Sequence, residues 1–177
     1  MLGLLPLLGT SREMRRSRLK LFCPALSLLL LAGYACRKPG PQNIIRMADL
    51  HTQKQLLRGF YQLEAGAWRW TEKDFSVMLK VPEDASKKGG VLTLQGSLPP
   101  ESVQNGPLEI TSHIGDIILE NKSFSKPGEI IYRVDVPPSA LTTPLVAAEF
   151  SLNSTHRVPG DARDLGVIAT VIGLRTK

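Results

Sequence analysis

The sequence predicts an all-β domain, an antiparallel β-sandwich of about eight strands. From residue 59 onward, short apolar segments alternate hydrophobic and polar positions, as in strands that bury one face. Gly and Pro clusters separate these segments about every 8–12 residues, a spacing typical of sandwiches and barrels. The chain has no Gly-rich phosphate loop and no alternation of strands with long helical segments. These absences argue against a parallel α/β fold and nucleotide binding.

The first 36 residues have the layout of an export signal. Basic side chains (Arg12, Arg15, Arg16, Arg18, Lys20) precede an apolar run over residues 21–34, and small residues lead to Ala35. Secretory signals combine a positive segment, an apolar segment and small residues at the cleavage site. We therefore expect residues 1–36 to be a signal peptide or N-terminal anchor helix. Met14, just before the arginines, is an alternative start.

Cys36 is the candidate attachment point for a lipid that would anchor the exported protein to a membrane. Ala35-Cys36 after an uncharged apolar run resembles the lipobox of bacterial lipoproteins, whose cysteine is acylated and becomes the first mature residue. This sequence departs from the lipobox at Gly33, where leucine is preferred. Ordinary cleavage after Ala35 and an uncleaved anchor remain the alternatives. The apolar run is shorter than the about 20 residues that a membrane-spanning helix needs, which disfavours the anchor.

The positions of the cysteines and of the charged residues exclude several kinds of site and partner. The only cysteines are Cys23 and Cys36, so the rest of the chain has no disulfide, thiol nucleophile or cysteine metal ligand. The net charge is +6. Of the 22 basic and 16 acidic residues, 5 and 1 precede residue 36, which leaves 17 and 15 in the remainder. Without a concentrated positive face, nucleic-acid binding is not expected.

The chain is expected to have three segments: the signal at 1–36, a tether and lead-in at 37–58, and the sandwich domain at 59–177. The Pro- and Gly-containing stretch 37–41 suits a tether, and 43–58 has the pattern of a short helix or lead-in. The predicted strands cover residues 60–63, 74–81, 91–98, 108–113, 116–119, 130–136, 145–152 and 165–174.

Aromatic and charged residues concentrate in residues 59–71. On a strand, Trp68 and Trp70 share one face and Arg69 lies on the other. With Tyr61, this group could form a platform on which a sugar ring stacks. The alternative is that the rings close one end of the core, because each aromatic side chain buries about 150–250 Å². Both interpretations stay open from sequence.

A second cluster, residues 159–166, precedes the last strand. Arg163 can form a bidentate bond with a carboxylate, and Glu64 is its natural partner, so we expect an ion pair that joins the two clusters. The other interpretation is that Asp161, Arg163 and Asp164 line a ligand pocket. Calcium binding is not expected, because the loop offers too few oxygens.

No catalytic signature accompanies these clusters. The three histidines, His51, His113 and His156, have no metal-binding spacing, and no serine lies in a G-x-S-x-G elbow. The sequence therefore predicts no catalytic residues, no metal and no cofactor. A concave pocket holding two carboxylates, or a Ser–His pair, would favour a hydrolase instead.

The two clusters together resemble a β-sandwich module of bacterial envelope proteins, found alone in lipoproteins or attached to glycosyltransferases or methyltransferases. Its pattern reads G-[FWY]-[YH]-x-x-E…[RW]W[TM] near the start and D-x-R-x-L-G before the last strand. This chain matches both ends, over residues 59–174, with Glu64, Trp70 and Arg163 at recurring positions. The resemblance implies a jelly-roll-like, carbohydrate-binding-like fold without catalysis, and it supplies no ligand.

The sequence thus predicts a non-catalytic, lipid-anchored protein of the cell envelope, on the periplasmic face or cell surface. Its partners are expected to be the membrane, through the anchor, and a glycan. The alternative partner is another envelope protein recognised through a sheet face or edge. The candidate ligand-binding residues are Tyr61, Glu64, Trp68, Arg69, Trp70, Asp161 and Arg163.

Acylation of Cys36 is tested by replacing it. Cys36→Ser removes the thiol that would carry the lipid. When membranes are dissolved in detergent and the detergent phase is separated, we expect the variant to be found in the aqueous phase and the wild type in the detergent phase. The measurement is the fraction in each phase, with Cys23→Ser as the matched control. A Cys36→Ser protein that still partitions with the detergent would contradict acylation.

Overall fold

The computed structural model describes residues 40–177, so the expected signal helix and Cys36 lie outside the described residues. All strand pairs in residues 40–177 are antiparallel, which confirms the all-β class. Within residues 40–177 no helix is long and apolar enough to cross a bilayer.

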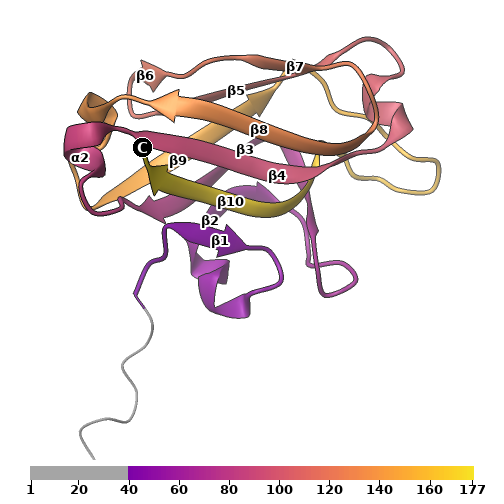
Figure 1. The fold of residues 1–177 in the computed structure, drawn as a ribbon. Coiled ribbons are helices and arrows are strands. Elements are labelled where there is room, and N and C mark those ends of the chain that lie inside the picture. Colours follow the sequence, from indigo (N-terminus) through magenta and orange to yellow (C-terminus); the bar gives the residue numbers. More distant parts are fainter. Residues whose placement is uncertain (1–39) are drawn as a thin grey trace, which may run out of the picture. The chain divides into compact units, whose positions relative to one another are not determined.

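Ten strands form one continuous, curled sheet (Figure 1). Seven of them follow the order β6-β5-β9-β3-β10-β4-β8, while β1, β2 and β7 pair with β10, β3 and β5. The strands are β1 (Ile44–Arg46), β2 (Leu56–Phe60), β3 (Arg69–Lys80), β4 (Gly90–Leu98), β5 (Leu108–Ile114), β6 (Ile117–Ile118), β7 (Lys122–Phe124), β8 (Gly128–Val136), β9 (Leu145–Leu152) and β10 (Ile168–Thr176). Short helical turns η2 (Leu50–Gln55), α2 (Ala85–Lys88), η3 (Pro100–Val103) and η4 (Pro138–Ala140) connect them.

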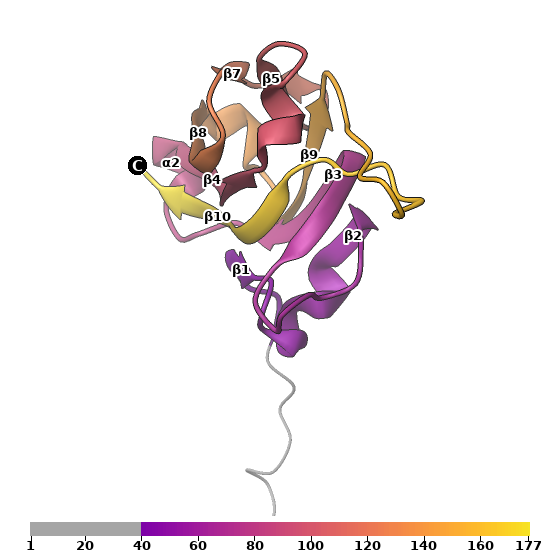
Figure 2. The ribbon, with the colours of Figure 1, turned by 90° about the vertical axis from the view of Figure 1, so that its right-hand side faces the viewer.

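The sheet curls so that its two halves face each other. Seen along its end, β4 and β8 lie on one side of the domain and β9 and β3 on the other (Figure 2). The halves are joined because β3 pairs with β10 at Trp70 and Ile168 before it continues as the partner of β9. The sequence predicted two separate layers, whereas the described strands form a single sheet that bends through β3.

Alternating side chains fill the space between the halves. Tyr132, Val134 and Val136 of β8 point inward, while Glu129 and Arg133 point out. The rings of Phe75 and Phe150 stack at 4.9 Å between centroids, and Tyr132 meets Phe150 edge-on at 5.9 Å.

The core also contains one polar link across its width. The Tyr132 hydroxyl lies 2.7 Å from the Ser112 hydroxyl, and it donates a hydrogen bond to the Glu120 carbonyl at 3.0 Å. Because buried polar groups are costly without partners, these bonds fix the position of β8 against β5.

The domain begins earlier than the sequence predicted. Residues 44–46 form β1, which pairs with β10, and both Ile45 and Met47 are buried in the core. The boundary at residue 59 was therefore wrong, and residues 43–58 belong to the sheet domain. Their i, i+2 and i, i+3 apolar spacing suits a strand as well as a helix, and three residues give too little pattern to decide.

Other strands agree with the predicted segments to different degrees. β9 covers residues 145–152, as predicted, and β4 and β8 each begin one or two residues earlier. β3 begins at Arg69, five residues before the predicted start, and β7 was not predicted. The start of β3 was missed because Thr71 to Asp74 do not alternate apolar and polar side chains.

Gly166 is required where β3 joins the opposite half. A Cβ at this position would lie 2.6 Å from Thr71 Oγ1, 2.7 Å from Leu152 Cδ1 and 2.8 Å from the Glu72 carbonyl oxygen. Contacts this short cannot be kept, so Gly166→Ala must displace either the loop or the backbone of β3.

We expect Gly166→Ala to lower the free energy of unfolding by about 1–3 kcal/mol, the usual cost of overpacking. Denaturant unfolding of the two proteins measures the difference. Gly40→Ala is the matched control, because no atom lies within 4 Å of its added Cβ. Equal stabilities of the Gly166→Ala and Gly40→Ala proteins would contradict the close approach.

Candidate functional site

A tight hairpin turn carries the first predicted cluster. The Ala67 amide donates to the Glu64 carbonyl at 3.0 Å, and Ala65 and Gly66 have φ values of 49° and 63°. Two central residues with positive φ define a type I′ turn, whose twist matches that of a hairpin. The turn brings Trp68 back beside Glu64, with the Glu64 amide 2.9 Å from the Trp68 carbonyl.

Arg163 joins this turn to the second cluster. Its Nη1 donates to Glu64 Oε1 at 2.7 Å, and its Nη2 donates to Asp161 Oδ2 at 2.7 Å. The guanidinium also lies 5.1 Å from the centre of the Tyr61 ring. We name Tyr61, Glu64, Asp161 and Arg163 the latch. The ion pair between Arg163 and Glu64 is the one that the sequence predicted.

Further bonds hold the latch loop in place. The Tyr61 hydroxyl donates to the Asp164 carbonyl at 3.1 Å. The Asp164 carboxylate in turn accepts from Arg157 Nε at 2.6 Å and Nη2 at 3.0 Å. Hydrogen bonding by Arg157 lowers the pKa of Asp164. The loop over residues 157–164 is thus tied both to itself and to the hairpin turn.

The two tryptophans lie together, as their spacing predicted. Their ring centroids are 5.9 Å apart with the rings perpendicular. Trp70 is buried, with 9% of its surface exposed, whereas Trp68 is half-buried. Arg69 is also buried, at 5% exposed. Arg69 and Trp70 are therefore not part of an exposed platform, because both side chains are covered. Tyr61, Glu64, Trp68, Asp161 and Arg163 retain partial exposure.

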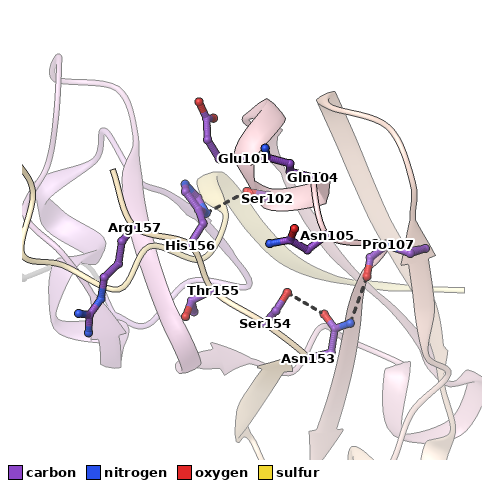
Figure 3. A pocket seen from close by; sticks show the side chains of 11 residues that line it. Glu101, Ser102, Gln104, Asn105, Pro107, Asn153, Ser154, Thr155, His156 and Arg157 are labelled. Carbon is purple, nitrogen blue, oxygen red and sulfur yellow. Dashed lines mark hydrogen bonds between the residues drawn. The ribbon is translucent and has the colours of Figure 1, made fainter. Parts of the chain in front are cut away.

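A polar cleft lies beyond Trp70. Its volume is about 420 Å³, within the range of about 300–1,000 Å³ of small-molecule pockets. Figure 3 shows the side chains that line it, from the segment around η3 and from the segment after β9. They include Gln104, Asn105, Asn153, Ser154 and Thr155. The wall nearest the core is His156, whose ring meets that of Trp70 at 5.6 Å.

Two amides of the cleft are available to a ligand. The side chains of Gln104 and Asn105 are exposed and make no hydrogen bond to other residues in the described range. Asn153, by contrast, is committed to structure, since its Nδ2 donates to the Pro107 carbonyl at 3.1 Å and its Oδ1 accepts from the Glu109 amide at 2.9 Å. The sequence did not predict this cleft, because its two segments are about 50 residues apart and carry no catalytic or sugar-binding motif.

The cleft contains a Ser–His pair, the feature that would favour a hydrolase. Ser102 Oγ lies 3.2 Å from His156 Nδ1 (Figure 3), and burial lowers the pKa of His156 from its ordinary value. However, Ser102 is 8% exposed, and His156 Nε2 is buried with no partner in residues 40–177. In a catalytic triad a carboxylate orients the histidine through that second nitrogen. Within residues 40–177 no carboxylate is hydrogen-bonded to that nitrogen, although the charge of nearby Glu101 opposes the lowering of the His156 pKa.

No metal site is apparent in the part of the chain that the structure describes. Residues 40–177 contain no group of three or more His, Cys, Asp or Glu side chains placed to hold an ion. The carboxylates of Asp161 and Asp164 both face arginines, which occupy the oxygens that a cation would need.

Comparison with solved structures gives the fold. The chain is similar to part of a family GH115 4-O-methyl-α-glucuronidase with specificity for decorated arabinogalactans, at a TM-score of 0.51 and 11% identity. The match covers 78% of this chain and 18% of that enzyme, so this chain spans under one fifth of it. A ruminal GH26 endo-β-1,4-mannanase matches over 78% of this chain and 26% of its own, with 10% identity and a TM-score of 0.36, too low to support an argument. No protein-family model matches, and no curated protein does.

The latch makes stability depend on acid pH. Hydrogen bonds from the Arg163 side chain and backbone amide lower the pKa of Asp161 to about 2 from its ordinary 3.8. Because the folded-state pKa is depressed, the contribution of Asp161 is present above about pH 4 and is lost as the pH falls toward 2.

We therefore expect the free energy of unfolding of the wild-type protein to fall more between pH 5 and pH 2 than that of Asp161→Asn, which cannot titrate. Denaturant unfolding at intervals across this range measures both profiles. Asp116→Asn, a change in an exposed turn outside the latch, is the control and should follow wild type. Parallel profiles for wild type and Asp161→Asn would show that the latch carries no such linkage.

Proposed function

We propose that this chain is a non-catalytic, lipid-anchored protein of the cell envelope whose β domain binds a glycan in the polar cleft. The export signal and Cys36 support the location and the anchor. The cleft supports the ligand, and the single observation that carries this part is the presence of free amide groups on its exposed rim. We further propose that the curled sheet is a β-sandwich of jelly-roll type, on the support of its two facing halves.

Sugar chemistry fits the lining of the cleft. Each hydroxyl of a glycan both donates and accepts hydrogen bonds, and amide and hydroxyl side chains do the same. Gln104 and Asn105 offer two such groups on one segment, and Ser154 and Thr155 offer two on the other. Trp70 is not part of a stacking platform, which was one interpretation of the sequence. Its ring contacts the ring of His156 at the wall of the cleft instead. The fold is shared with a segment of a glycan-degrading enzyme, and that likeness agrees with this proposal without specifying a ligand.

The alternative is an adaptor that recognises another envelope protein through a sheet edge. β8 is nine residues long and ends the strand path, paired with β4 alone among the described strands. Its Ile131 side chain is 62% exposed on the outer face. An unpaired edge strand can accept a strand from a partner, whose affinity comes from main-chain hydrogen bonds.

A glycan-array screen of the full chain in detergent, together with variants of the cleft, distinguishes the two functions. If a glycan binds in the cleft, the double change Gln104→Ala and Asn105→Ala removes two or more hydrogen bonds and should weaken binding about tenfold or more. Asn121→Ala, an exposed amide outside the cleft, should leave affinity unchanged.

Affinity is measured by calorimetry with the glycan that the array selects, and circular dichroism checks that each variant is folded. Failure to bind any glycan would rule out the cleft as a glycan-binding site, and so would equal affinity of the double variant and the wild-type protein. Capture of a partner protein that is lost on Ile131→Lys would then support the adaptor.

A further inference from the structure

A second hollow, which we name the cup, lies on the other side of the start of β3. Its volume is about 220 Å³, smaller than the pockets that hold drug-sized ligands. It shares no lining residue with the cleft, so a ligand of the cup does not depend on glycan binding in the cleft. The side chains that give the cup its chemistry are Arg69, Arg58, Gln53, Gln62, Leu57 and Phe60.

Arg69 is unusual among the residues that line the cup because its charged side chain is buried. Neighbouring residues on a strand point to opposite sides, so while Trp70 meets His156 at the cleft, Arg69 lines the cup. The side chain is 5% exposed. Its Nη1 donates to the Tyr61 carbonyl at 2.8 Å, but its Nε is buried without a partner. No carboxylate in residues 40–177 lies within 4.0 Å of the guanidinium, which forms no ion pair there.

An unpaired buried cation is costly for the folded state. Burying a charge costs several kcal/mol unless a counter-ion and hydrogen bonds offset it. The guanidinium of arginine stays charged in proteins, so this cost remains. The Tyr61 carbonyl satisfies one of the five N–H donors and supplies no negative charge. Within residues 40–177 the guanidinium of Arg69 therefore has no anion that balances its charge.

The surroundings of Arg69 suit an anion from outside. No acidic side chain lines the cup. Arg58 at its wall is paired with Glu149 at 2.6 Å, so of the two arginines that line the cup only Arg69 has no carboxylate partner within residues 40–177. A guanidinium binds a carboxylate through two parallel hydrogen bonds. Gln53 and Gln62 are exposed, and their amides make no hydrogen bond within the described residues, so they are free to bind hydroxyl groups. Leu57 and Phe60 give an apolar surface beside them.

We propose that the cup binds the carboxylate of an acidic sugar residue, a uronate, with Arg69 as its main anchor. The carboxylate supplies the missing counter-charge, the glutamine amides bind ring hydroxyls, and the apolar side chains contact the C–H face of the ring. Binding needs no covalent step, and the cup takes one sugar residue because of its small volume.

The test uses the full chain in detergent with four small probes: glucuronate, glucose, acetate and phosphate. Glucuronate is expected to raise the unfolding temperature in a concentration-dependent manner, because a ligand that binds only the folded state stabilises it. Glucose lacks the carboxylate and acetate lacks the ring, so each should give less than one tenth of the affinity. Equal effects of glucuronate and glucose, or of glucuronate and acetate, would overturn the proposal, as would a stronger effect of phosphate.

Variants of the cup residues test whether glucuronate binds in the cup. Arg69→Gln should abolish the glucuronate shift, and Gln62→Ala should weaken binding several-fold. Arg133→Gln changes an exposed arginine on the outer face of β8, outside both the cleft and the cup; it is the matched control and should respond as wild type. Without ligand, Arg69→Gln should unfold no more easily than wild type, because it removes an unpaired charge.

A spectroscopic measurement keeps the test decisive if Arg69→Gln does not fold. In the wild-type protein, the Nε–H resonance of Arg69 should shift on titration with glucuronate and stay in place with glucose. An unmoved Arg69 resonance, or a glucuronate response that survives Arg69→Gln, would show that the cup is not the site. Loss of cleft binding in the Gln104 and Asn105 variants leaves these readouts unaffected, so the two proposals fail separately.

Discussion

The fold depends on the place where β3 crosses from one half of the sheet to the other. There, Thr71 donates its amide to the Val167 carbonyl at 2.9 Å and accepts the Gly166 amide on its own carbonyl at 2.7 Å. Its hydroxyl accepts from the Val167 amide at 3.0 Å. Thr71 is fully buried, so these bonds have no competition from water. They join the segment just before β10 to the start of β3, next to the pairing of Trp70 with Ile168 through which the two halves of the curled sheet meet.

This junction explains why charged and aromatic residues collect around it. The hairpin turn at residues 64–68 and the loop at residues 157–164 are irregular, and neither contributes a residue to the main core between the sheet halves. Arg163, with Glu64 and Asp161, supplies ion pairs where apolar packing is lacking. Trp70 and Leu165 are buried near the junction and fill the space between the loop and β3. The two clusters that the sequence shows, at residues 59–71 and 159–166, thus contain residues that close the sheet.

Part of this structure could be predicted from sequence, and the reason differs between its parts. Strand β9 was predicted with its observed ends, because its apolar side chains alternate and Pro144 precedes it. The Glu64–Arg163 pair could be predicted from complementary charge in two clusters flanking the same junction. The cleft could not, because Asn105 and His156 belong to loops without periodicity that approach only when the sheet curls. The burial of Arg69 could not be predicted either. The alternation of side chains along a strand shows on which face Arg69 lies, but it does not show which residues cover that face.

The two arginines near the junction give the clearest indication of where structure ends and binding begins. Arg163 retains about one third of its side-chain exposure and yet has two carboxylate partners and an aromatic ring. Arg69 is almost completely buried and has one neutral partner. If both residues served only to stabilise the fold, the more deeply buried guanidinium would need the carboxylates more, since its desolvation costs more. The opposite arrangement is observed. A structural role accounts for Arg163 in full, whereas the position of Arg69 is explained when an anion from outside the chain completes it.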